Sequence, residues 1–211
     1  FLKHPTILFT ALAFWTYNYI LYFFLTWFPS YLTEAKGLSI SEMSIVVMIP
    51  WIVGALGQAL GGFFSNYIYM KTGKLLFSRK AIIVPCLLIT AICISLTGVV
   101  DTATSSVALM TFAVFFLYLT AMIYWAIIQD TVASNNLGGV SGFTHLLANT
   151  SGIVAPALTG FIVQFTGDYT SAFIFAGILA IIGSVSVGIF VKPIILKKSL
   201  NIDVKMDKSI N

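Results

Sequence analysis

Residues 102–129 read TATSSVALMTFAVFFLYLTAMIYWAIIQ, a run without a single Asp, Glu, Lys or Arg. About 20 predominantly apolar residues are enough for a helix to cross the hydrocarbon core of a bilayer. Further runs of this kind, each of at least 20 residues, cover 5–33, 43–70, 81–100, 131–167 and 169–191. Transmembrane strands would be only about 10 residues long, with strict alternation. The sequence therefore predicts an all-α integral membrane protein, a bundle of six transmembrane helices.

The composition excludes several other classes of protein. Of 211 residues, 59% are hydrophobic and only 9% are charged, and the mean hydropathy is +0.99. Soluble domains carry about 25% charged residues, and disordered chains need low hydrophobicity. A water-soluble enzyme and a disordered protein are therefore excluded. The net charge of +4 reports membrane topology rather than binding to nucleic acid.

The two cysteines, Cys86 and Cys93, lie in one apolar run. Two thiols so placed form neither a disulfide framework nor a metal site. We expect them to be small apolar core residues, and we expect no metal and no cofactor.

Loop residues between the apolar runs set the limits of the spans. Residues 133–139 read ASNNLGG, which is typical of a loop, so the fifth helix is expected to begin near residue 140. The predicted spans are 6–32, 43–69, 81–100, 106–128, 140–166 and 169–191. They make up one unit over 1–195, followed by a polar tail at 196–211.

The basic residues are distributed unequally between the two ends of the predicted spans. One end holds Lys3, Lys71, Lys74, Arg79, Lys80, Lys192, Lys197, Lys198, Lys205 and Lys208, whereas the other holds only Lys36. Lys and Arg accumulate in cytoplasmic loops. We therefore expect a multi-pass protein of the cell membrane, with the lipid bilayer around it and with both termini and the tail in the cytoplasm.

Four of the predicted helices each carry a polar face. The faces follow helical spacing and comprise Trp15, Asn18, Tyr19 and Tyr22; Gly54, Gln58 and Gly62; Tyr118, Ala121, Trp125 and Gln129; and Ser141, His145, Asn149 and Gly152. Polar side chains within a bilayer tend to face the bundle interior or a water-filled cavity. The four faces together predict a central cavity for a ligand with hydroxyl or carboxylate groups.

The candidate substrate-binding residues are Asn18, Tyr22, Gln58, Tyr124, Trp125 and Asn149. His145 can titrate near neutral pH and is the candidate proton-linked residue. Hydrogen bonds between neighbouring helices explain each amide equally well, at roughly 0.6–2 kcal/mol each. Gly54, Gly57 and Gly61 are better explained as close-packing positions.

No Asp, Glu, Lys or Arg lies in the middle of any predicted span. Coupled carriers use such residues for proton relays and anion capture. This segment alone is therefore poorly equipped to couple anion movement to a proton.

Several local patterns together resemble the major facilitator superfamily, and within it the anion:cation symporter group, whose members carry hexuronates, galactonate, phthalate or sialic acid. The first span, NYILYFFLTWFPSY at 18–31, is similar to the seventh helix of that group. Residues 125–130 and 142–162 look like its tenth and eleventh helices. The loop motif of the superfamily, Gly-x-x-x-Asp followed by basic residues and Gly, is matched by Gly62, Asn66, Lys71, Gly73, Arg79 and Lys80. Asn66 replaces the usual Asp, which puts a charge-based gating pair there in doubt.

The resemblance, over about residues 1–195, implies one half of a twelve-helix fold, namely the C-terminal six-helix half. The chain opens on Phe1, and we expect it to be a fragment of a longer protein. The implied function is secondary active transport of a small organic anion such as a sugar acid, coupled to a proton or another cation by alternating access. The implied partner is the N-terminal six-helix half, which would hold the anion-binding and coupling charges. Asn18, Tyr22, Trp125 and Asn149 look similar to group positions that line the cavity.

Three alternatives remain open. The first is a carrier of the same superfamily for a neutral sugar or a drug. The second is a six-span protein that assembles with itself. The third is an intramembrane serine protease, because residues 139–142 match a Gly-x-Ser-Gly pattern and His145 lies one turn after Ser141. Rhomboid proteases take their base from a different helix, so we expect no enzyme.

Overall fold

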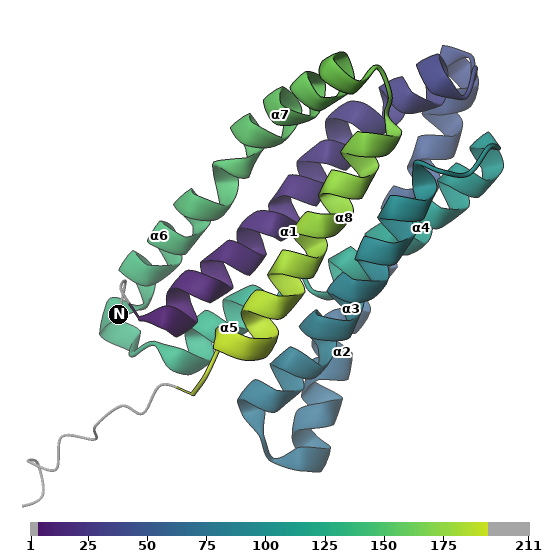
Figure 1. The fold of residues 1–211 in the computed structure, drawn as a ribbon. Helices are drawn as coiled ribbons and strands as arrows, with labels where there is room; N and C mark the ends of the chain where they lie inside the picture. Colours follow the sequence, from purple (N-terminus) through teal and green to yellow (C-terminus); the bar gives the residue numbers. More distant parts are fainter. Residues whose placement is uncertain (1–3, 194–211) are drawn as a thin grey trace, which may run out of the picture.

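Six helical segments long and apolar enough to cross a membrane make up the fold (Figure 1). The computed structural model describes residues 4–193, so the predicted tail at 196–211 and its lysines lie outside the described residues. The segments are Pro5–Ala35, Ile40–Thr72, Leu75–Thr97, Ala103–Thr131, Ser134–Thr166 and Thr170–Phe190. The predicted all-α bundle of six spans is confirmed.

Two of these segments are interrupted, and two end in a π-helical turn. The helices are α1 (Pro5–Ser30), α2 (Ile40–Thr72), α3 (Leu75–Thr97), α4 (Ala103–Leu119), α5 (Ile123–Thr131), α6 (Leu137–Asn149), α7 (Ser151–Thr166) and α8 (Thr170–Val185). The π turns are η1 (Tyr31–Ala35) and η3 (Ser186–Phe190), and a 3-10 turn, η2 (Ser134–Asn136), precedes α6. The fourth membrane segment consists of α4 and α5, and the fifth of η2, α6 and α7.

Local sequence explains where several helices begin and end. Ser39 and Glu42 form a capping box at the start of α2, which satisfies backbone donors that have no partner within the helix. Gly73, with φ of 65°, ends α2, and Gly167, with φ of 72°, ends α7. Helix α6 starts at Leu137, three residues before the predicted residue 140, because Gly138 and Gly139 adopt ordinary helical backbone angles.

Helix α1 lies at the centre of the bundle and packs against α6, α7 and α8. In its most apolar stretch 67% of the residues are buried, against 17% in that of α2 and 22% in that of the segment of α6 and α7. Phe23 and Tyr31 meet the ring of Phe173 of α8 edge to face, at centroid distances of 5.0 and 4.7 Å. Burial of these large rings supplies the apolar core.

Helix α2 packs closely against α4 through glycines. A Cβ atom at Gly57 would lie 2.5 Å from the carbonyl oxygen of Phe115, and one at Gly61 would collide with that of Leu119. Small residues four apart let two membrane helices approach to backbone contact. This confirms Gly57 and Gly61 as close-packing positions; Gly54, one turn earlier, lies against Val114 and Tyr118.

The interruptions between α4 and α5 and between α6 and α7 lie near the middle of their segments. At the first, the amides of Thr120, Ala121 and Ile123 bond to carbonyls three residues back, and the Thr120 hydroxyl donates to Leu117 O at 2.7 Å. A Thr hydroxyl that bonds to the local backbone competes with the helical pattern. The second interruption lies at Thr150, whereas Pro156 sits within α7.

Polar side chains join neighbouring segments at one end of the bundle. At the end away from the termini, the Tyr169 hydroxyl donates to Glu34 at 2.6 Å and Lys36 donates to Val100 O at 2.6 Å. Burial raises the pKa of the Tyr169 phenol, and the adjacent Glu34 carboxylate raises it further. Tyr169 therefore stays protonated and keeps its role as donor.

Candidate functional site

Tyr22 of α1 and Asn149 of α6 meet at the middle of the bundle. The Tyr22 hydroxyl donates to Asn149 Oδ1 at 3.3 Å, and Asn149 Nδ2 donates to the backbone oxygen of His145 at 2.9 Å. A Cβ atom at Gly152 would come within 2.9 Å of the Tyr22 ring. The glycine one turn after Asn149 thus leaves room for the ring. The structure brings these two predicted residues together.

Aromatic rings of α1, α5 and α6 lie next to the Tyr22–Asn149 pair, and the pair with these rings is called the polar surface below. The rings of Trp125 and His145 lie 5.3 Å apart, and Phe14 meets Trp125 edge to face at 5.6 Å. His145 is exposed and Trp125 is half-buried. Trp125 therefore presents an indole, an apolar surface with a polar edge, beside the His145 ring that Asn149 also contacts.

Asn18 is the most buried of the predicted residues whose polar groups make no hydrogen bond within residues 4–193. Its side chain is 7% exposed, yet its amide makes no hydrogen bond to any other residue among residues 4–193. Among the described residues, Thr144 Oγ1 is the one fully buried side-chain polar atom without a partner, so the amide atoms of Asn18 still reach solvent and are open to water or a ligand. Asn18 lies near mid-length of α1, so the unpaired amide is at the depth expected for a substrate.

Tyr124 and Gln58 occupy different surroundings. Tyr124 is fully buried, its ring stacks on Phe14 at 5.1 Å, and its hydroxyl lies 3.2 Å from the Thr120 hydroxyl, within hydrogen-bond distance. Tyr124 therefore belongs to the core, where Phe14 contacts both Tyr124 and Trp125. Gln58 is half-buried on α2, and no hydrogen bond between described residues joins it to Tyr22 or Asn149.

Tyr17 is a residue that the sequence reasoning did not select, and Tyr118 belongs to a predicted polar face but not to the candidate substrate-binding residues. Tyr17 is 5% exposed, and its ring lies 6.3 Å from that of Tyr118 and 5.7 Å from that of Tyr124. Tyr17 lies beside Asn18 in the sequence but outside the face drawn by helical spacing. The size of the ring lets Tyr17 reach α4 and α5 from that position.

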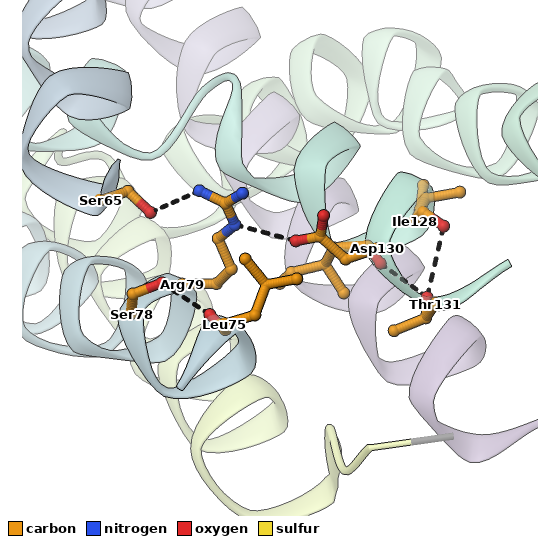
Figure 2. A network of polar contacts seen from close by, with 8 residues as sticks. Ser65, Leu75, Ser78, Arg79, Ile128, Asp130 and Thr131 are labelled. Carbon is orange, nitrogen blue, oxygen red and sulfur yellow. Dashed lines mark hydrogen bonds and ion pairs between the residues drawn. The ribbon is translucent and has the colours of Figure 1, made fainter. Parts of the chain in front are cut away.

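The loop motif lies at the end of the bundle that holds both described termini (Figure 2). Arg79 Nε pairs with Asp130 Oδ2 at 3.0 Å, and Arg79 Nη1 donates to Ser65 Oγ at 2.8 Å. The charge pair at this loop therefore exists, but its acid comes from the end of α5. Asn66, which stands where the superfamily motif has Asp, is exposed on α2.

The remaining residues of the motif have separate surroundings. The Lys71 ammonium lies over the Tyr67 ring at 4.7 Å, and Lys80 donates to Gly188 O at 3.0 Å. Gly62 has open space around it, and Gly73 adopts the left-handed angle that ends α2. The motif thus joins α2, α3, α5 and η3 at this end.

Ser141 and His145 do not form a nucleophile and base pair. No hydrogen bond joins the two side chains within the described part of the chain, and the His145 ring packs against Trp125 and Asn149 instead. The protease alternative has no geometric support here.

Six helical segments long and apolar enough to cross a membrane, two of them interrupted near mid-length, define a multi-pass helical membrane protein. The model of the Major Facilitator Superfamily matches residues 1–156. The chain belongs to this superfamily.

The named relatives are all transporters. The hexuronate transporter of Bacillus subtilis (strain 168) is 56% identical over 93% of this chain and 47% of its own length. A probable galactarate/D-glucarate transporter of the same strain is 36% identical over 84% of this chain and 39% of its own length. A probable sulfoacetate transporter of Cupriavidus necator is 30% identical over 85% and 41%, respectively. The chain spans about half the length of these relatives, or less.

Proposed function

We propose that this chain forms the C-terminal six-helix half of a secondary active transporter for a sugar acid. The observation that carries the proposal is the Asn18 amide, which lies near mid-length of α1, makes no hydrogen bond within residues 4–193 and keeps its polar atoms accessible although the residue is only 7% exposed. The relatives named as hexuronate and galactarate/D-glucarate transporters support a polyhydroxylated acid as the substrate.

The polar surface of this half suits the hydroxyl groups of such a substrate. We propose that Asn18, Tyr22, Gln58, Trp125 and Asn149 contact the ligand and that Tyr124 supports Trp125 through the Phe14 ring, which both contact. An amide can both donate and accept, as a sugar hydroxyl does. Because the described middle of the bundle holds no Arg, Lys, Asp or Glu, the carboxylate and the coupling ion are assigned to the N-terminal half.

The substrate would lie between the two halves, near the middle of the membrane. Interrupted helices line such sites in secondary transporters, because irregular backbone is tolerated there where it faces a cavity. The interruptions at Thr120–Met122 and Thr150 support this placement. Alternating access would then move the two halves against each other around the site.

Uptake by proteoliposomes that contain the protein expressed from its complete gene tests this function. Labelled glucuronate or galacturonate should accumulate, and unlabelled acid should compete, whereas glucose should not. Uptake of glucose without competition from either acid would contradict the proposal and favour a carrier of neutral sugars.

We propose that the end with both described termini faces the cytoplasm. Lys71, Lys74, Arg79, Lys80 and Lys192 lie at this end, against Lys36 at the other, which follows the positive-inside rule. A cysteine replacing Thr72 should react with a membrane-impermeant thiol reagent only in broken cells, and one replacing Thr104 should react in intact cells. The reverse pattern of labelling would contradict this orientation.

A further inference from the structure

A cavity lies at the lysine-rich end of the bundle, apart from the polar surface at mid-depth. Its volume is about 530 Å³, and its lining includes Lys74, Phe77, Lys80, Asp130 and Pro193. Cavities of roughly 300–1,000 Å³ hold small ligands or their headgroups. This cavity has no part in the proposed binding of a sugar acid.

Positive charge is concentrated around this cavity. Lys74 and Lys80 line it, and Lys192 lies close enough to Lys80 for the two charges to repel each other. Within residues 4–193, Asp130 is the one carboxylate in the lining, and it is paired with Arg79 at 3.0 Å. The cations therefore exceed the acids, and an anion in the cavity would relieve the repulsion.

The position of Lys80 is fixed, which distinguishes it from an ordinary surface lysine. Its ammonium donates to the backbone oxygen of Gly188 at 3.0 Å, which leaves two of its three N–H donors for a ligand. Lys74 is exposed and its ammonium makes no hydrogen bond among the described residues. The two lysines thus offer several donors to one wall of the cavity.

The other walls of the cavity are apolar. Phe77 is 54% exposed, and Leu75 and Leu76 are half-buried beside it. A free inorganic ion would leave this apolar surface in contact with water. A molecule that carries a phosphate next to a hydrocarbon chain would cover both kinds of surface.

We propose that this cavity binds the phosphate headgroup of an anionic phospholipid. The phosphate oxygens would accept from Lys74 and Lys80, and the glycerol and upper acyl chain would lie along Phe77. Basic pockets between membrane helices on the cytoplasmic side are suited to anionic headgroups. The proposal shares with the proposed function only the cytoplasmic position of this end.

Native mass spectrometry of the complete protein in neutral detergent tests the proposal. Dioctanoyl phosphatidylglycerol should be retained more strongly than dioctanoyl phosphatidylcholine or glycerol phosphate. Lys74→Gln and Lys80→Gln should each weaken its binding about 5-fold, and the double variant about 30-fold, because each lysine near a charged headgroup contributes about 1 kcal/mol. Lys80→Arg should retain most of the affinity.

Lys71→Gln is the matched control, because Lys71 lies at the end of α2, close to Lys74 in the sequence, but places its ammonium over Tyr67, outside the cavity. Equal losses for Lys71→Gln and Lys74→Gln would overturn the proposal in favour of diffuse surface charge. Glycerol phosphate bound as tightly as the lipid would overturn the lipid assignment.

Lys74→Gln removes no side-chain hydrogen bond, so it tests the cavity even if Lys80→Gln fails to fold. Binding of sugar acids should stay unchanged in Lys74→Gln, which separates this proposal from the proposed function.

Discussion

Asn18→Ala in the complete transporter should weaken binding of a sugar acid about 10- to 100-fold without lowering the thermal stability of the protein. The loss follows because a substrate hydroxyl group would be left without its partner in the site, which costs about 1–3 kcal/mol. Stability should be unaffected because the Asn18 amide has no partner among the described residues. Isothermal titration calorimetry with glucuronate and a thermal unfolding curve of the same sample measure both quantities.

Asn149→Ala serves as the comparison, because this amide is bonded on both sides. It accepts from Tyr22 at 3.3 Å and donates to His145 O at 2.9 Å. We expect it to lower both affinity and stability, whereas Asn135→Ala, at the exposed turn before α6, should change neither. Unchanged affinity in Asn18→Ala would remove Asn18 from the site.

Gly61→Ala should destabilise the bundle, because α2 and α4 leave no room for a methyl group at this position. The new Cβ would collide with the carbonyl oxygen, the carbonyl carbon and the Cα atom of Leu119. These are backbone atoms, which cannot rotate away as a side chain can. Overpacking of this kind costs about 1–3 kcal/mol, occasionally more. A lower midpoint in thermal unfolding, and less folded protein in the membrane, would measure the effect.

Gly62→Ala is the control for this substitution. It changes the next residue of the same helix, where an added Cβ would meet nothing within 4 Å. Alanine is favoured over glycine within helices by up to about 1 kcal/mol, so the control should be neutral or slightly stabilising. Equal losses from the two substitutions would show that α2 does not pack on α4 through Gly61.

The six spans were predictable because each is an apolar run long enough to cross a bilayer. The interruption between α4 and α5 was not, because no Pro or Gly marks Thr120–Met122. There a Thr side chain bonds to the backbone, and Thr is common within uninterrupted helices too. The uninterrupted spacing drawn from Tyr118 to Trp125 consequently ran across three non-helical residues.

The polar surface was predictable in part. Helical spacing selected Tyr22 and Asn149, which lie on two helices and meet as expected. It could not show that Tyr124 is fully buried whereas Trp125 is half-buried, since neighbouring residues on a helix differ in burial only through tertiary packing. Nor could it show that Arg79 pairs with Asp130, because the pairing depends on where α5 ends relative to α3.

The central position of α1 has a consequence for synthesis of the protein in the membrane. Within this chain its partners arrive late: the bonds from Trp15 to Thr150, Tyr22 to Asn149 and Trp27 to Pro156 span 135, 127 and 129 residues. Ribosomes add about 5–20 residues per second, so roughly 6 to 27 s pass before α6 and α7 exist. Helices α3 and α4, by contrast, can pair as soon as both are inserted. During that interval Asn18 and Tyr22 need lipid headgroups, water or insertion machinery beside them.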